Sequence, residues 1–200
     1  MNLKTILGPA FLVLCLAAAG LVVATGPAKP TMQGFTLYIS QTTYPVDGAP
    51  IPTATKVRRQ KSDGSWKLET SYVSGKFEVT YGQPGSGVFA VDAKNRKLEY
   101  LSHSSSRPLA DIDWSKRPGF AGEETILGYK TYRIRSENDG QYTDSYLCPA
   151  LQGYPLRVIT GNARAKTVWE TTQVIPGEPV FEDVPTLPVS TKRFEEKNKQ

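Results

Sequence analysis

The chain is poor in the side chains that carry most enzymatic and metal chemistry. It has one histidine, His103, and two cysteines, Cys15 and Cys148, among 200 residues. A zinc site takes about four ligands, most often histidine and cysteine, and a thiol nucleophile needs a neighbouring base. The sequence also contains no Gly-x-Ser-x-Gly elbow, no phosphate loop and no dinucleotide fingerprint. We therefore predict no metal, no cofactor and no catalytic residue, so that the protein is not an enzyme.

A long run of one charge is missing as well. Lysine and arginine number 24 against 19 aspartate and glutamate residues, which gives a formal net charge of +5. The densest basic run is Lys56, Arg58, Arg59 and Lys61. Nucleic-acid binding usually uses a longer basic stripe with interleaved aromatic residues, so we predict no nucleic-acid partner. The run is typical of a solvated strand, and attraction to anionic lipid headgroups is the intermediate interpretation.

One long apolar run is present, at the start of the chain. No charge interrupts the segment from Ile6 to about Ala24, which is typical of a secretory signal or a single membrane anchor. Two small-residue cleavage patterns are available, whereas lipidation at Cys15 is disfavoured because Leu14 precedes it. We predict that residues 1–28 are a signal peptide or membrane anchor. The folded part is then exported, either periplasmic or membrane-anchored and facing the periplasm or the outside.

The rest of the chain shows no long pattern with the 3.6-residue period of a helix. It consists of about nine or ten short, alternating or β-rich runs, separated by turn residues. They include FTLYIS, TKVRRQK, WKLETSYV, KFEVTY and PLRVIT. Asp63-Gly64 is a hairpin signal between two of these runs, and a short helix is expected at 108–115.

Tight turns between short strands force antiparallel neighbours, and so long a meander must curl or split. The predicted fold is all-β to β-dominated. It is an antiparallel meander curled into an incomplete, half barrel with few short helices. Residues 29–185 would form this domain, and residues 186–200 would be a polar tail, frayed or disordered.

The densest stretch is ETILGYKTYRIRSENDGQYTDSYLCP, residues 124–149, which is typical of a hairpin. A four-residue loop would pair Ser136 with Gln141. A three-residue loop with a bulge at Gly140 would pair Glu137 with Gln141 instead.

Face patterning favours the bulged register, because a slip of one residue moves every side chain to the other face. In that register Tyr132 opposes Tyr146 and Lys130 opposes Cys148, on one largely apolar face that also carries Asp144. Charged groups on such a face need a partner, a rim position or a polar ligand.

Several apparent catalytic or metal patterns have simpler interpretations. Cys148 is expected to be a packed core thiol, and apolar surroundings would raise its pKa. His103, in a serine-rich stretch, is expected in a polar surface loop. Asp111 and Asp113 lack the spacing of a calcium loop and are expected to begin a helix. If the leader is removed, Cys148 has no partner for an internal disulfide, and the fold depends on its core.

Three segments together carry a resemblance to a known family. They are VFAVDAKNRKLEYL, ILGYKTYRI and CPALQGYPLRV. This order resembles the bacterial outer-membrane lipoprotein-carrier superfamily and its secreted relatives. In that superfamily a glycine-led strand precedes a strand ending near a Gly-x-Pro-Leu turn, positions matched here by Gly128 and by 153–156. The resemblance covers roughly residues 34–175.

The resemblance implies an incomplete barrel whose hydrophobic concave face is closed by a helical lid. It also implies binding of acyl chains or other apolar ligands without catalysis. This sequence departs from the pattern in two places. No helical lid is evident unless residues 102–122 supply it, and Cys148-Pro149 replaces the family's aromatic residue after the second hairpin strand.

We therefore expect an exported envelope protein that binds an apolar or amphipathic, lipid-like ligand on a concave sheet face. Lining residues are predicted from the alternating runs and the hairpin, with Lys130 and Asp144 as polar anchors. The apolar and aromatic ones are Phe35, Leu37, Ile39, Trp66, Leu68, Phe77, Val79, Tyr132 and Tyr146. The alternative is a ligand-free interaction or sensor module of the cell envelope. A minor alternative is an envelope hydrolase using serine, His103 or Cys148.

Overall fold

The computed structural model describes residues 33–102, 112–187 and 189–190. These residues form a single sheet in which twelve strands are assigned. The strands are β1 (Phe35–Pro45), β2 (Ile51–Gln60), β3 (Trp66–Tyr72), β4 (Phe77–Gln83), β5 (Gly87–Asp92), β6 (Lys97–Ser102), β7 (Phe120–Ile126), β8 (Tyr129–Asn138), β9 (Gln141–Cys148), β10 (Tyr154–Gly161), β11 (Ala165–Pro176) and β12 (Val189–Ser190).

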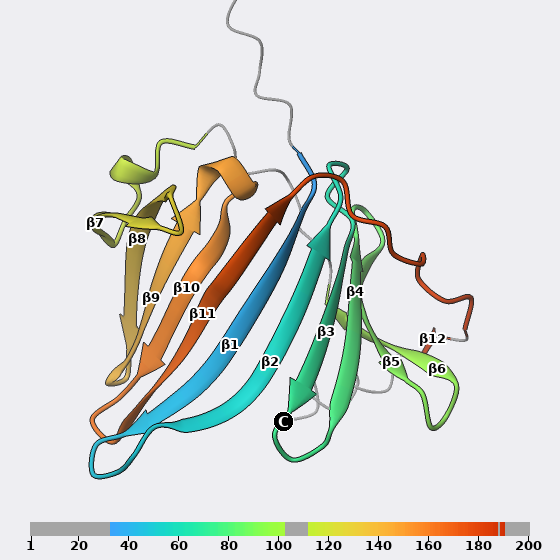
Figure 1. The fold of residues 1–200 in the computed structure, drawn as a ribbon, viewed down its shortest axis with the longest axis horizontal. Helices are drawn as coiled ribbons and strands as arrows, with labels where there is room; N and C mark the ends of the chain where they lie inside the picture. Colours follow the sequence, from blue (N-terminus) through green and yellow to red (C-terminus); the bar gives the residue numbers. More distant parts are fainter. Residues whose placement is uncertain (1–32, 103–111, 188, 191–200) are drawn as a thin grey trace, which may run out of the picture. The chain divides into compact units, whose positions relative to one another are not determined.

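The strand order is β12-β6-β5-β4-β3-β2-β1-β11-β10-β9-β8-β7 (Figure 1). All neighbours are antiparallel except β12, whose two residues pair parallel to β6. β1, the first strand in the chain, therefore lies in the middle of the sheet. β2 to β6 extend from one side of β1 as a meander, and a second meander, β7 to β11, returns from the opposite edge to pair with the other side of β1.

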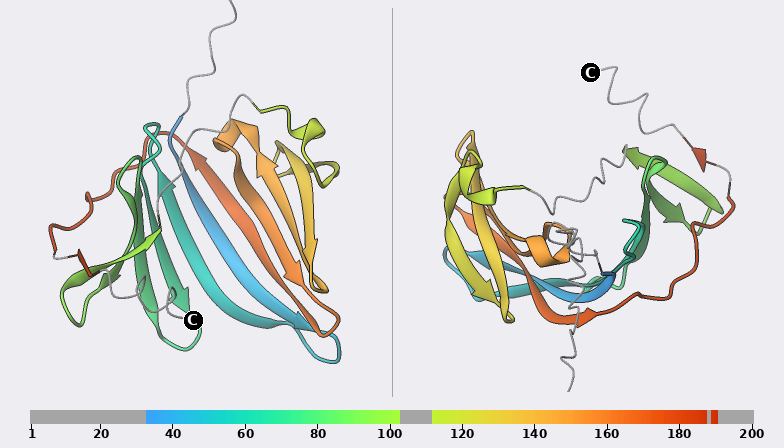
Figure 2. Two further views of the ribbon diagram at one scale, coloured as in Figure 1. Left: turned by 180° about the vertical axis from the view of Figure 1, so that it is seen from behind. Right: turned by 90° about the horizontal axis from the view of Figure 1, so that it is seen from above.

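The sheet curls but does not close. Viewed along the strands, it forms a trough whose edges, β7 on one side and β6 with β12 on the other, do not meet (Figure 2). The predicted half barrel is confirmed. The 3₁₀ helix η2 (Pro149–Leu151) lies inside the trough, and residues 177–187, here called the C-terminal strap, run along its convex side (Figure 2).

Ionic and backbone contacts hold the C-terminal strap to the convex face of β2 and β3. Glu178 accepts hydrogen bonds from the backbone N–H of Ser62, and Lys67 Nζ lies 3.3 Å from a carboxylate oxygen of Glu182. Because these carboxylates are exposed, each contact stabilises the strap only weakly. The strap therefore marks the convex face of β2 and β3, and the opposite, concave face is the open one.

The alternation of β1 explains where the core forms. Phe35 and Leu37 are fully buried and Ile39 nearly so, while Tyr38 between them is exposed. They belong to the hydrophobic core cluster, which also includes Ile126, Tyr146, Cys148, Leu151 and Leu156. Period-two alternation thus places one side of the central strand in the core.

Helical structure is scarce in the described residues. Besides η2 there is one 3₁₀ turn, η1 (Trp114–Lys116), whose N-cap Asp113 accepts a hydrogen bond from the Ser115 backbone N–H. Asp113 thus precedes a helical turn, as expected, but residues 112–113 of the helix predicted at 108–115 are not helical and residues 108–111 lie outside the described residues. The part of the expected lid that is described, 112–122, holds η1 and the beginning of β7, and 103–111 lie outside the described residues. Neither described helix is long and apolar enough to cross a membrane.

The β8–β9 hairpin corrects the predicted register. Asn138 pairs with Gln141, so the loop has only two residues, Asp139 and Gly140. Both have positive φ, 50° and 71°, as a type I′ turn requires, and Asp-Gly is a preferred sequence for that turn. Neither the four-residue loop nor the bulged loop forms, because the tighter turn matches the twist of the two strands.

Candidate functional site

The strand register decides which side chains share the concave face. Residues paired directly across an antiparallel ladder point to the same side of the sheet, as do alternate residues along one strand. On this basis three rows of side chains run across β1, β2 and β3 on the concave face. They are Phe35, Gln60 and Trp66; Leu37, Arg58 and Leu68; and Ile39, Lys56 and Thr70.

The middle strand of these rows carries charge into the trough. Lys56 is 8% exposed and Arg58 is 9% exposed. The interpretation of the basic run as a solvated strand is therefore wrong for these two residues. It fails because aliphatic cross-strand neighbours and the aromatic rings that contact the two side chains shield them from water.

Arg58 lies between two aromatic rings. Its guanidinium carbon is 4.2 Å from the ring centroid of Trp66 and 4.4 Å from that of Tyr154. Nε and Nη2 donate to Gln60 Oε1 at 3.1 and 2.8 Å. Burial lowers the pKa of the guanidinium, and no salt bridge within the described ranges includes Arg58. The charge is held by rings and an amide and is not neutralised by a carboxylate.

Gln60 continues this polar contact toward η2. Its amide donates to Gln152 Oε1, and the Gln152 amide in turn donates to the backbone carbonyls of Gln33 and Lys61. Both glutamine side chains are buried. This amide chain fixes Gln60 Oε1 in position to accept from Arg58.

Lys56 lies two residues along the same strand. Its Nζ is 3.5 Å from the ring centroid of Trp169. Burial lowers the pKa of the ammonium group, and the carboxylate of Glu78 offsets only part of that effect. Among the residues that the structure describes, Lys56 makes no salt bridge. It is a second cation held by an aromatic ring.

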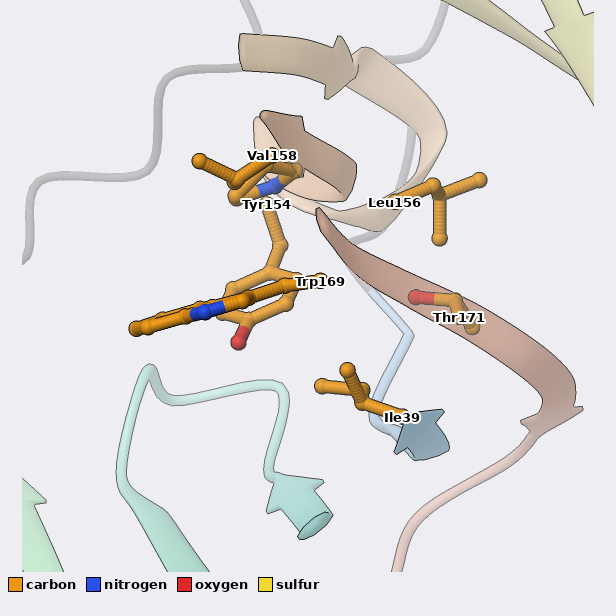
Figure 3. A pocket seen from close by; sticks show the side chains of 7 residues that line it. Ile39, Tyr154, Leu156, Val158, Trp169 and Thr171 are labelled. Carbon is orange, nitrogen blue, oxygen red and sulfur yellow. The ribbon is translucent and has the colours of Figure 1, made fainter. Parts of the chain in front are cut away.

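Figure 3 shows a small apolar pocket, which lies next to the two cations because Tyr154 and Trp169 contact them and also line it. Its lining residues come from β1, β10 and β11, and its volume is about 60 Å³. They are Ile39, Tyr154, Pro155, Leu156, Val158, Trp169 and Thr171. Binding pockets for drug-sized molecules usually hold at least ~300 Å³, so a larger ligand would place only one part here and the rest in the open trough.

Thr171 is the polar exception in this apolar lining. Its side chain is buried, and its Oγ1 has no hydrogen-bond partner among the described residues. In Figure 3 the hydroxyl oxygen is directed toward the interior of the pocket. A buried hydroxyl without a partner is unfavourable, and a ligand or water in the pocket could satisfy it.

The predicted lining residues divide between the two faces. Phe35, Leu37, Ile39, Trp66 and Leu68 lie together on the concave face. Tyr132 follows them there through the pairing of β8 with β9 to β11.

Phe77 and Val79 lie on the convex face, which corrects their predicted placement. In the β3–β4 ladder, Leu68 pairs with Thr80, so Val79 beside it points the other way. Phe77 is 59% exposed. The sequence shows the alternation within β4. Which set of its side chains faces the trough depends on the pairing with β3, and alternation alone does not reveal that pairing.

Tyr146 and Asp144 also lie on the convex face. They pair with Arg133 and Arg135, which alternate along β8 with the concave Tyr132. Asp144 is 3% exposed and accepts a 2.8 Å hydrogen bond from Arg133. Tyr146 lies under the guanidinium groups of Arg133 and Arg157. These contacts form a paired ionic surface, and Asp144 is not exposed to the trough.

Lys130 is exposed on the opposite side of the β8–β9 hairpin. It forms a 2.8 Å ion pair with Glu123 on the edge strand β7, and the hydrogen bond to that carboxylate raises the pKa of the lysine. The expectation that Lys130 and Asp144 share one face is corrected by the two-residue turn.

Cys148 is fully buried in the core cluster, and burial raises the pKa of its thiol. Its interpretation as packing is confirmed. His103 and Asp111 lie outside the described residues. Within the described ranges no three metal-ligating side chains come together.

The sequence contains a signal that places Lys56 and Arg58 on the concave face, although the prediction from sequence did not use it. Asp63-Gly64 marks a β2–β3 hairpin, and the structure confirms it, with Gln60 paired to Trp66. Counting back from that turn places Arg58 and Lys56 opposite Leu68 and Thr70. The apolar face of β3 was recognised, and its cross-strand partners could have been read from it.

No protein-family model matches the chain, and no curated protein is significantly similar to it in sequence. Solved structures of similar fold include members of the lipoprotein-carrier superfamily that the sequence resembles. One is a LolA superfamily protein from Nitrosomonas europaea, with 11% identity and a TM-score of 0.39, covering 77% of this chain and 88% of that one.

Two further solved structures show the same kind of distant likeness. A putative outer membrane lipoprotein-sorting protein domain from Vibrio parahaemolyticus has 7% identity and a TM-score of 0.36, over 77% of this chain and 89% of that one. The MucA/MucB complex of Pseudomonas aeruginosa has 15% identity and a TM-score of 0.43, over 80% of this chain but only 59% of that one. Likenesses this distant transfer no ligand, partner or activity.

Proposed function

We propose that this protein binds an amphipathic, lipid-like ligand on the concave face of its sheet, without catalysing a reaction on it. The observation that carries the proposal is the small apolar pocket between Tyr154 and Trp169, which opens into the trough beside buried polar groups. An apolar portion of a ligand would enter the pocket. A more polar portion would lie in the open trough near β2.

The apolar segment at residues 1–28 supports a place for this function in the cell envelope. As a signal peptide or anchor it would deliver the sheet to the periplasm or to a membrane surface. A lipid-like ligand would be available in either place.

The test is to purify the full chain from cells that express it, extract it with organic solvent and identify any lipid by mass spectrometry. We expect lipid to be recovered in stoichiometric amount. The Trp169→Ala variant removes one wall of the pocket and should lose most of it. Gln173→Ala changes an exposed residue that pairs with Tyr38 on the opposite face of β11, and it serves as the matched control.

A second measurement makes the test independent of what the host supplies. Monoolein, an uncharged single-chain lipid, is titrated into the delipidated chain while tryptophan fluorescence is followed. Trp66 and Trp169 lie on the concave face, so binding there should change the signal. If no lipid is recovered and monoolein does not bind, the proposal fails. A ligand-free interaction or sensor module would then be the better description.

A further inference from the structure

Two buried cations on the concave face make no salt bridge within the described residues. Lys56 and Arg58 lie two positions apart on β2 and therefore point to the same side of the sheet. Burying a charge is strongly unfavourable unless it is paired. Two adjacent buried positive charges add mutual repulsion to that cost.

Other buried or half-buried cations of the sheet show what ordinary pairing looks like in this molecule. On the convex side Arg59 pairs with Glu69, and Arg133 pairs with the buried Asp144 at 2.8 Å. Arg157 reaches both Glu124 and Glu170. Lys56 and Arg58, on the concave face, contact aromatic rings and an amide where these other cations contact carboxylates.

Glu78 is the acidic group that acts on Lys56. It pairs with Thr70 and so lies in the same row of the concave face, but it is already engaged. It forms a 2.5 Å ion pair with Lys76 and accepts a 2.8 Å hydrogen bond from the Tyr72 hydroxyl. Its effect on Lys56 is smaller than that of burial. The concave face therefore keeps an excess of positive charge around β2.

The aromatic rings hold these charges in place without neutralising them. Cation–π contacts are strongest where water is excluded, and Arg58 makes two of them, with Trp66 and Tyr154. A fixed, partly desolvated positive charge interacts with an incoming anion more strongly than a solvated one does. The arrangement is preorganised for an anion.

The rings also connect the cations to the apolar pocket. Tyr154 contacts Arg58 and lines the pocket, and Trp169 contacts Lys56 and lines the same pocket. Thr171 adds an unpartnered, buried hydroxyl to that pocket. Positive charge and apolar lining thus share two side chains, which is the arrangement that an anionic amphiphile requires.

We propose that Lys56 and Arg58 bind the anionic headgroup of a lipid whose apolar part occupies the neighbouring pocket and trough. This inference rests on the proposed function and specifies its ligand class. In this proposal the charges on β2 make the site selective for anionic headgroups. The apolar surface supplies the affinity that all lipids share.

The test compares two lipids that differ in headgroup charge and share one acyl chain. Oleoyl lysophosphatidylglycerol and zwitterionic oleoyl lysophosphatidylcholine are each titrated into the purified full chain below their micelle concentrations. Tryptophan fluorescence reports binding. We expect the anionic lipid to bind at least about tenfold more tightly, as charge-assisted contacts in a partly buried site allow.

Variants locate that preference on β2. In the double variant Lys56→Gln, Arg58→Gln we expect the two lipids to bind equally, with lysophosphatidylcholine affinity within about twofold of wild type, because the apolar pocket is retained. Arg59→Gln, on the same strand but the opposite face, should keep the full preference. Thermal unfolding of each variant confirms that it is folded.

The outcomes separate the two proposals. Equal binding of both lipids by the wild-type chain overturns the headgroup inference and leaves the proposed function standing, and this comparison does not depend on any variant folding. Failure of both lipids and of monoolein overturns the proposed function as well. If glycerol 3-phosphate alone binds as tightly as the anionic lipid, the site recognises a free anion and the lipid inference is wrong.

Discussion

At the scale of single residues, Lys56 and Arg58 distinguish this sheet from one with a purely apolar concave face. A lysine or arginine at an alternate strand position normally extends to solvent, and on β2 the aromatic neighbours prevent it. The positive charges reduce the stability of the fold and are available to a ligand. Under the proposed function, ligand binding and stability therefore oppose each other at these positions.

Replacing Lys56 by methionine should stabilise the protein. The substitution removes a desolvated charge and keeps an apolar chain beside Trp169, so we expect the free energy of unfolding at pH 7 to rise by about 1 kcal/mol. Urea denaturation of the two proteins measures the difference. A less stable Lys56→Met variant at pH 7 would show that other contacts of the ammonium group outweigh the cost of burying its charge.

The same pair of proteins should respond differently to pH. Burial lowers the pKa of Lys56 in the folded state, so from that lowered value up to the unfolded value of about 10.4 the unfolded chain binds more protons. The wild-type free energy of unfolding gains a term that rises with pH in this window. The advantage of Lys56→Met should shrink as pH increases from 7, and a constant difference would contradict the assigned cause.

At the scale of elements, the β3–β4 hairpin depends on a close approach between Trp66 and Gly82. The two residues pair directly across the ladder, and a Cβ at position 82 would overlap the indole ring. Glycine lets the ring lie flat on the strand. From there it can reach Arg58 in the next strand.

Gly82→Ala should therefore displace Trp66 and lower the free energy of unfolding by about 2 kcal/mol, a typical cost of overpacking. Combining it with Trp66→Leu should relieve the overlap, so the effects of the two substitutions should be strongly non-additive. Denaturant unfolding of the four proteins measures this coupling. Additive effects would mean that the two residues do not conflict.

At the scale of the whole sheet, β1 joins two meanders that are distant in sequence. It pairs with β2 on one side and β11 on the other, whereas β7 has a neighbour on one side only and β12 contributes two residues. Backbone hydrogen bonds in the centre can open only when both meanders separate. Those at the edges can open locally.

Hydrogen exchange followed by mass spectrometry should show this gradient. We expect amides of β1 and β11 to exchange slowest and those of β7 to exchange orders of magnitude faster under native conditions. Amides of β4 and β5 should be intermediate. Protection of β7 as strong as that of β1 would indicate a further strand or partner on that edge.

The sequence by itself determined the class of structure and much of its local detail. Alternation in the β1 segment predicted Phe35, Leu37 and Ile39 on one buried side, and short runs between turns predicted antiparallel neighbours. The burial of Cys148 followed from its apolar surroundings. These features are local, because a strand's period and a turn's residues act within a few positions.

Only the tertiary structure decided which side chains of each strand face the trough and which distant strands pair. Asp139-Gly140 closes a two-residue turn, which moves Asp144 and Tyr146 to the convex side, and the β3–β4 register places Val79 there too. The return of β11 to β1 brings Trp169 over Lys56. A single-residue slip changes the face of every side chain, and contacts between β1 and β11 join segments more than a hundred residues apart, so neither is encoded in a local pattern.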